Sequence, residues 1–111
     1  IVTQMFFDNQ KYFEFVKKCR EMDIHIPIIP GLKPIDSKAQ LKMLPSKFFV
    51  ELPEALTKEI ESCKTTEAVK QAGIEWCIAQ SKELKDAGVP VLHYYTMSRS
   101  QATVAIAKEI F

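Results

Sequence analysis

The sequence has 111 residues, 47% of them hydrophobic, and its 15 Lys and Arg residues nearly balance its 14 Asp and Glu residues. This length suits one domain, and the composition is too apolar for a disordered chain and too often interrupted by charge for a membrane span. The formal net charge of +1 leaves no electrostatic footprint for nucleic acid or an anionic membrane, so neither is expected as a partner.

The metal-ligating residue types are few and scattered. Cys19, Cys63 and Cys77 form no C-x-x-C pair, and the two histidines, His25 and His93, lie far apart. An odd, widely spaced set of cysteines argues against a disulfide framework or a zinc site and favours a reducing cytoplasm. We expect no metal site.

Strand-like and helix-like segments alternate from the first residue. Residues 1–7 are apolar except at Thr3 and Gln4, which predicts a strand buried on both faces. Asp8 or Asn9 then predicts the N-cap of an amphipathic helix.

The middle of the chain continues this alternation. Residues 24–29 predict a second buried strand, which ends at Pro30. Asp36 or Ser37 predicts the cap of a helix that Pro45 ends.

A pair of helices follows a linker. Residues 48–53 are interpreted as a linker rather than a short strand, and residues 54–63 as a short helix. A longer helix begins after Thr65 or Thr66 and ends at Gly88, where a left-handed glycine is expected.

The last part predicts a third buried strand over residues 89–97 and a final helix with an inward stripe of Ala102, Ile106 and Ile110. Strands joined by helical crossovers run parallel. A (β/α)8 barrel needs about 250 residues and eight such units, and this chain supplies three. Because it also opens at Ile1 without a methionine, we expect an excerpt of a larger protein.

Ligands of parallel α/β folds bind beyond the carboxyl ends of the strands. Glycine-rich phosphate loops and the nucleophile elbow are missing from the sequence. Gln4 is an amide in an apolar strand, suited either to the edge of a heterocycle or to neighbouring backbone. Arg99, in the first turn of the last helix, could meet a ligand carboxylate or a loop acid.

Other polar residues have plain structural interpretations. Gln40 is expected to face solvent, His93 to be an interior histidine, and Asp8 to be a helix cap. Tyr94 and Tyr95 are interpreted as packing residues.

Three ordered motifs carry a family resemblance: residues 3–8 (TQMFFD), residues 28–35 (IIPGLKPI) and residues 88–99 (GVPVLHYYTMSR). Together they resemble the C-terminal part of the methylenetetrahydrofolate reductase family, whose pattern reads roughly T-Q-x-F-F-D, I-I-P-G-x-x-P and H-F-Y-T-x-N-R. The resemblance implies an α/β fold of parallel βα units, the C-terminal three strands of a (β/α)8 TIM barrel. Residues 1–111 would be a single segment of that barrel.

The resemblance also implies site residues. Gln4 would read the pterin edge of folate, Gln40 would support the ligand, and Arg99 would meet the folate glutamate carboxylate. Leu44, at a position where the family often carries an aromatic residue, and Met97 are possible substrate contacts. No catalytic residue is assigned to this segment.

The implied enzyme reduces 5,10-methylenetetrahydrofolate to 5-methyltetrahydrofolate with FAD and NAD(P)H, and the nicotinamide cofactor uses the same face as folate in alternation. The family residues that contact FAD, and its proton-donating glutamate, precede the strand of Gln4. We therefore expect this chain alone neither to hold FAD well nor to turn over.

Two alternatives remain open. One is an inactive barrel fragment or assembly module that forms a homo-oligomer through exposed strand edges. The other is a different barrel enzyme, such as an aldolase or a phosphate-sugar enzyme. The predicted elements lack a catalytic lysine at a strand end and a glycine-rich phosphate loop, and this argues against a different barrel enzyme.

Overall fold

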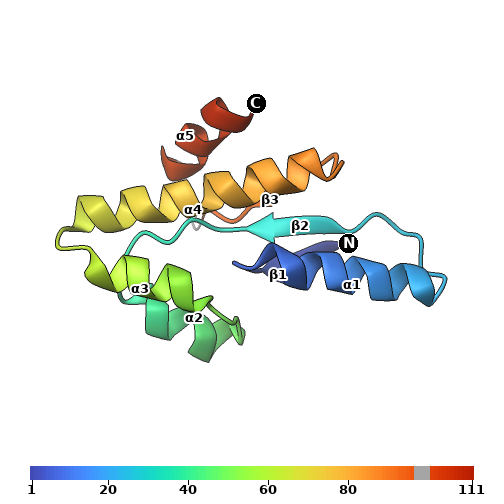
Figure 1. Ribbon diagram of the computed structural model, residues 1–111, viewed down its shortest axis with the longest axis horizontal. Coiled ribbons are helices and arrows are strands. Elements are labelled where there is room, and N and C mark those ends of the chain that lie inside the picture. The colour runs from blue at the N-terminus through green and yellow to red at the C-terminus, as the bar shows by residue number, and fades with distance from the viewer. Residues whose placement is uncertain (97–100) are drawn as a thin grey trace.

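Three parallel strands and five helices make up the part of the chain that the computed structural model describes, residues 1–96 and 101–111 (Figure 1). In chain order the elements are β1 (Val2–Met5), α1 (Asn9–Glu21), β2 (Ile29–Leu32), α2 (Gln40–Phe48), α3 (Glu54–Ser62), α4 (Thr66–Asp86), β3 (His93–Tyr94) and α5 (Gln101–Ile110). The strands pair in parallel in the order β1-β2-β3, which confirms the predicted parallel sheet. This order has no reversal, as expected of consecutive strands of a barrel.

Polar caps and apolar stripes form most helices where the sequence predicts them. The carboxylate of Asp8 accepts a hydrogen bond from the Gln10 amide at 3.0 Å, and the Thr65 hydroxyl accepts one from the Ala68 amide at 3.1 Å. Both predicted caps are confirmed, since each satisfies an otherwise unpaired donor of the first turn. Gly88, with φ of +91°, follows the end of α4 as predicted.

The second strand lies further along the chain than predicted. Residues 24–28 are irregular and end at β2, which begins at Ile29. The Arg20 guanidinium donates to the carbonyl oxygens of Ile24 and Ile26, at 2.8 and 3.0 Å. These carbonyl groups are therefore held by the end of α1, and the prediction of a strand over residues 24–29 is wrong.

Helix α2 also differs from its prediction. It begins at Gln40, without a side-chain cap, and it continues through Pro45 instead of ending there. Leu44 is fully buried, and Leu41 and Phe48 pack against the same cluster. This packing outweighs the one hydrogen bond that Pro45 cannot donate, because tertiary contacts routinely override local propensity.

Strand β3 is shorter than the predicted residues 89–97. It pairs with β2 only at His93 and Tyr94. One further amide, that of Tyr95, donates to the Leu32 carbonyl at 2.8 Å, where β2 ends. The end of β2 therefore limits the carboxyl end of this strand.

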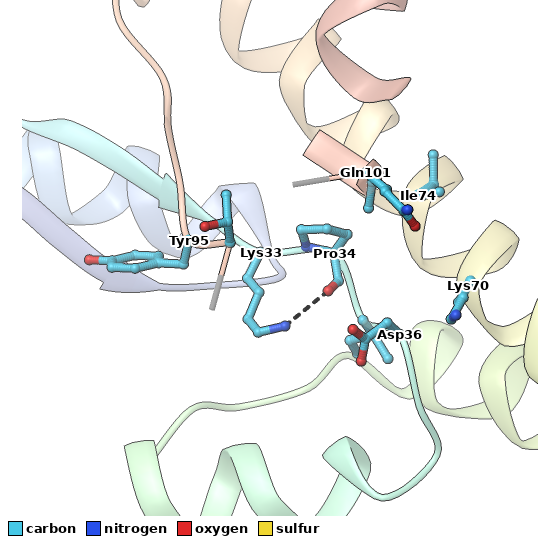
Figure 2. A pocket seen from close by; sticks show the side chains of 10 residues that line it. Lys33, Pro34, Asp36, Lys70, Ile74, Tyr95 and Gln101 are labelled. Atoms are coloured by element: carbon cyan, nitrogen blue, oxygen red, sulfur yellow. Dashed lines mark hydrogen bonds between the residues drawn. The ribbon is translucent and has the colours of Figure 1, made fainter. Parts of the chain in front are cut away.

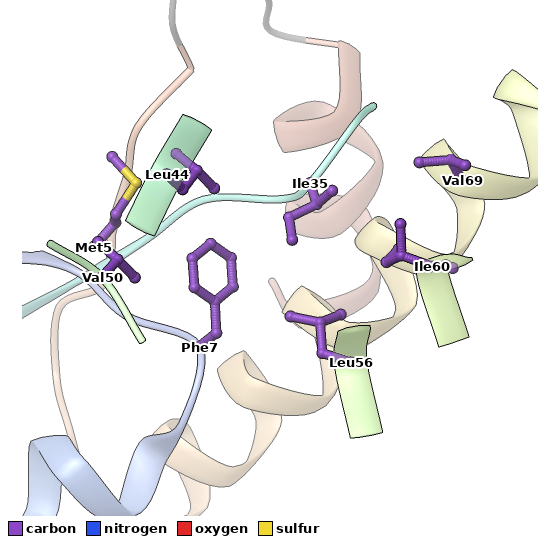
Figure 3. Packing of buried hydrophobic residues seen from close by; sticks show 9 residues of the cluster. Met5, Phe7, Ile35, Leu44, Val50, Leu56, Ile60 and Val69 are labelled. Atoms are coloured by element: carbon purple, nitrogen blue, oxygen red, sulfur yellow. The ribbon is translucent and has the colours of Figure 1, made fainter. Parts of the chain in front are cut away.

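Two apolar clusters stabilise the fold. The carboxyl-end core lies beyond the tip of β2, where α2 and α3 gather (Figures 1 and 3). Its members are Met5, Phe7, Ile35, Leu44, Val50, Leu56, Ile60, Val69 and Ala72. The helix-face core lies between the sheet and helices α1, α4 and α5, and comprises Tyr12, Ile28, Leu32, Cys77, Leu84, Ile106 and Ile110.

The other face of the sheet is open in this chain. Val2 and Gln4 of β1 and His93 of β3 are exposed. The prediction that the strands are buried on both faces is therefore wrong for the described residues. Within these residues, no helix is both long enough and apolar enough to cross a bilayer.

Candidate functional site

Gln4 presents its side chain at β1, an edge strand of the sheet. It is exposed and lines a cavity of about 360 Å³ beside the carboxyl end of β1. Its Oε1 accepts a hydrogen bond from the Met5 amide at 3.1 Å, while its Nε2 donates to no described residue. The side chain is thus oriented by the backbone and keeps its two N–H donors for a ligand.

The opposite wall of this Gln4 cavity is the connection between α2 and α3. Residues 49–53 line it together with Asp8 and Lys11 at the start of α1. Lys11 Nζ lies 3.4 Å from Glu51 Oε2, with both side chains exposed, so this ion pair adds little stability. Phe49 is 90% exposed and places an aromatic ring at this cavity.

Gln40 has a different environment from Gln4. It is buried at the start of α2, and its Oε1 accepts a hydrogen bond from the Asp36 amide at 2.8 Å. The expectation that Gln40 faces solvent is wrong, because the side chain fastens the loop after β2 to the helix that follows. A glutamine in this position shapes the edge at which a ligand would bind.

Three further residues, Leu44, Met97 and Arg99, are predicted to contact the substrate, and the structure describes the first of them. Leu44 is fully buried in the carboxyl-end core, where it packs with Phe7 and Ile35 (Figure 3). Met97 and Arg99 lie outside the described residues.

A second cavity, of about 180 Å³, lies where β2 and β3 end (Figure 2). Lys33 directly follows β2 and is 4% exposed, with its ammonium group donating to the Pro34 carbonyl at 3.2 Å. Lys70 of α4, Asp36 and Tyr95 line the same cavity. Lys33 stands at a strand end because β2 lies further along the chain than predicted.

Side chains from α4 fix the carboxyl end of β1. Trp76 Nε1 donates to the Phe7 carbonyl at 2.9 Å, and Gln80 Nε2 donates to the Phe6 carbonyl at 3.2 Å. These partners lie about 70 positions apart in the sequence, so no local pattern could reveal them. They hold in place the backbone that follows Gln4.

The buried thiol of Cys77 and the half-buried phenol of Tyr94 lie on the helix side of the sheet. Burial raises the pKa of Cys77 to about 12 and also raises the pKa of Tyr94. The Ser81 hydroxyl lies 2.7 Å from the Tyr94 hydroxyl and donates to the Cys77 carbonyl at 2.8 Å. A thiol that stays protonated at neutral pH is a packing group, since the thiolate is the reactive form.

The glycines of the chain do not form a cradle for a dinucleotide. Its three glycines are Gly31 within β2, Gly73 within α4 and Gly88 after α4. A pyrophosphate is usually held by a glycine-rich turn that leads into a helix N-terminus. The described residues of this chain therefore offer no glycine-rich turn of this kind.

Fold and cavities together define a class: a parallel α/β chain with two cavities at the carboxyl edge of its sheet, the edge at which such folds bind ligands. Amide donors lie at one cavity, and two ammonium groups with one carboxylate lie at the other. Such a site recognises a ligand by hydrogen bonds and charge.

The chain belongs to the methylenetetrahydrofolate reductase family, whose profile matches residues 1–110. The resemblance carried by the three motifs is thereby confirmed.

Curated relatives agree with this family. The chain is 35% identical to the probable methylenetetrahydrofolate reductase (NADPH) of Caenorhabditis elegans, over 99% of this chain and 17% of that protein. It is 33% identical to methylenetetrahydrofolate reductase (NADH) 1 of Arabidopsis thaliana, over 96% of this chain and 18% of that protein. It is 30% identical to 5,10-methylenetetrahydrofolate reductase of Salmonella typhimurium, over 95% of this chain and 36% of that protein. The chain therefore spans between a sixth and about a third of the length of these relatives.

Proposed function

We propose that this chain is the folate-binding, C-terminal part of the catalytic (β/α)8 barrel of a methylenetetrahydrofolate reductase. Residues 1–111 would form one segment of that barrel, and the complete protein would reduce 5,10-methylenetetrahydrofolate to 5-methyltetrahydrofolate. The sequential parallel order of β1, β2 and β3 supports the barrel. The family match supports the reaction.

The observation that carries this proposal is the exposed Gln4 amide. The motif of residues 3–8 places a glutamine in β1, and the fold leaves its Nε2 donors at a cavity. A pterin edge offers hydrogen-bond acceptors to such donors. Gln4 would thus orient the heterocycle for hydride transfer, a positional contribution of the kind that proteins make to cofactor chemistry.

The other site residues support the remainder of the ligand. Gln40 would act through the loop that it fastens after β2, and Arg99 would bind the folate glutamate carboxylate by its guanidinium group. Leu44 would contribute by packing beneath the site, and Met97 would contact the substrate.

The complete enzyme would use FAD and NAD(P)H. FAD supplies the hydride chemistry when bound, and its contacts would come mostly from residues outside this chain, since the glycines here form no pyrophosphate cradle. The relatives are named for NADPH in one case and NADH in another. We propose a cytoplasmic enzyme that takes a nicotinamide cofactor on the same face as folate.

The open edges of the sheet support a second proposal, that of a homo-oligomer. Ile1, Val2 and Val91 are exposed apolar residues in or beside edge strands, and unpaired edges associate readily. If the chain is instead an inactive assembly module, the 111-residue protein forms a discrete oligomer in size-exclusion chromatography and binds no folate. Folate binding to the complete protein would contradict the inactive module.

Turnover of the complete protein tests the function. Incubation with 5,10-methylenetetrahydrofolate and either NADH or NADPH should yield 5-methyltetrahydrofolate, and the purified protein should show a flavin absorbance band. The isolated 111-residue chain should show no such band. Lack of turnover by a complete, flavin-loaded protein with both nicotinamide cofactors would contradict the proposal.

A further inference from the structure

Strand β1 carries an irregularity in the interval that contains Thr3 and Gln4. The register of β1 against β2 shifts between Val2 and Met5. Here the Gly31 amide donates to the Thr3 hydroxyl oxygen at 3.0 Å, and the same hydroxyl donates to the Gln4 carbonyl at 2.9 Å. The Thr3 side chain thus takes the position that a backbone carbonyl would occupy in a regular parallel ladder.

The Thr3 carbonyl has a partner from the residue that directly follows β3. The Tyr95 hydroxyl donates to it at 2.8 Å. Figure 2 shows the Tyr95 ring directed away from the Lys33 cavity and toward β1. Tyr95 therefore bridges β3 to β1, two strands that do not pair with each other.

Gly31 makes this bridge possible. A Cβ at Gly31 would lie 2.6 Å from the Thr3 carbonyl oxygen and 2.7 Å from Cε2 of Tyr95. Both distances are far below van der Waals contact, so a larger residue would displace the ring or the carbonyl. The glycine of the second motif and the tyrosine of the third thus act on the threonine of the first.

The bridge also connects the two cavities. Tyr95 lines the Lys33 cavity, Gln4 lines the cavity beside β1, and the Thr3 carbonyl that accepts the hydrogen bond immediately precedes Gln4. Bulges can re-aim a side chain of the strand that carries them, and Gln4 lies within the irregular interval. Without the Tyr95 hydroxyl, the Thr3 carbonyl would lose its partner, and the peptide between Thr3 and Gln4 could rotate back toward the regular ladder.

We propose that Tyr95 is a positioning residue for folate binding, which acts by holding the bulge that aims the Gln4 amide. This inference rests on the proposed function. Tyr94 offers a matched control because it is the neighbouring tyrosine, but its hydroxyl lies against Ser81 on the helix side of the sheet.

Titration of the complete protein with 5-methyltetrahydrofolate tests the proposal. Tyr95→Phe keeps the ring and removes the hydroxyl, and it should raise the Kd by about threefold to tenfold, the range set by one net hydrogen bond. Thr3→Val, which removes both hydrogen bonds of the hydroxyl, should shift the Kd in the same direction. Tyr94→Phe should leave the Kd unchanged.

A double-mutant cycle with Gln4→Ala separates positioning from general structural damage or direct ligand contact. Tyr95→Phe should have no further effect in the Gln4→Ala background. An equal loss in both backgrounds, or no loss in the wild-type background, would overturn the proposal while leaving the proposed function intact. If Gln4→Ala itself leaves the Kd unchanged, the proposed folate site fails and the inference fails with it.

Discussion

The covered and open faces of the three-stranded sheet use neighbouring residues of the same strands in different ways. On the covered face, Leu32 is fully buried and the Tyr94 hydroxyl meets Ser81 of α4. On the open face, His93 is exposed and the Tyr95 hydroxyl reaches across β2 to the Thr3 carbonyl, next to the exposed Gln4. The same residue type, one position apart, thus contacts a helix in one case and the backbone of an edge strand in the other.

This difference follows from the two-residue period of strands, which sends successive side chains to opposite faces. Residues on the covered face should therefore control stability, and those on the open face should control ligand affinity. Three substitutions on the covered side test the first half of that separation.

The largest effect is expected at Leu32. Leu32→Ala removes a fully buried side chain from the helix-face core and should lower the free energy of unfolding by about 2–5 kcal/mol. Urea unfolding of the complete protein, followed by circular dichroism, measures the change. Val104→Ala, at a position 49% exposed on α5, should stay within about 0.5 kcal/mol of the wild type. Equal effects at the two positions would contradict the assignment of the covered face.

A smaller loss is expected at Asn9, which links α1 to α4. Its Nδ2 donates to the Gln80 carbonyl at 3.1 Å and to Glu83 Oε1 at 2.9 Å, and its Oδ1 accepts from Gln80 Nε2 at 3.1 Å. Asn9→Ala should cost about 1–3 kcal/mol, because buried polar groups lose their partners. Gln10→Ala, at the exposed neighbouring position, is the control. Urea unfolding measures both variants, and Asn9→Ala should lower the free energy of unfolding clearly more than Gln10→Ala does.

The third effect depends on pH. Burial raises the pKa of Cys77 from 9.0 to about 12, against the lowering influence of the Ser81 hydrogen bond and the Lys33 charge. The folded state therefore holds this proton more strongly than the unfolded state. The protonated Cys77 thiol therefore makes its full contribution to the free energy of unfolding below pH 9. This contribution is lost as the pH rises from 9 toward 12.

Cys77→Ala should accordingly reduce the fall in melting temperature between pH 9 and pH 11. Burial raises the pKa values of Tyr12 and Tyr94 as well, so part of the fall should persist. In the native protein at pH 8, a thiol reagent should leave Cys77 unmodified. Modification of native Cys77, or an unchanged pH profile in the variant, would argue against a closed helix-face core.

Local chemistry is enough to predict most helices of this fold. Asp8 and Thr65 cap α1 and α4 because their side chains meet amides two or three residues ahead. The predictions based on Pro30 and Pro45 are wrong, because the effect of a proline on a strand or helix depends on distant packing partners. Pro45 lies inside α2, which the carboxyl-end core supports, and the strand near Pro30 lies several residues later than its apolar run indicates.

The candidate site is predictable to a smaller extent. Gln4 is found from its motif, but its exposure depends on what covers the second face of the sheet. Lys33 reaches a strand end only once the bounds of β2 are known. The Tyr95 bridge joins residues 92 positions apart, so its chemistry is invisible until the strands are paired.

The central claim is that the exposed Gln4 amide at the carboxyl end of β1 binds folate. Isothermal titration of the complete protein with 5-methyltetrahydrofolate tests it most directly, in the wild type, in Gln4→Ala and in Gln71→Ala. Gln71 is an exposed glutamine of α4 that bonds to Glu75. Gln4→Ala should raise the Kd by about tenfold, equivalent to about 1.4 kcal/mol, while Gln71→Ala should leave it unchanged. An unchanged Kd for Gln4→Ala, or equal weakening by both substitutions, would contradict the account.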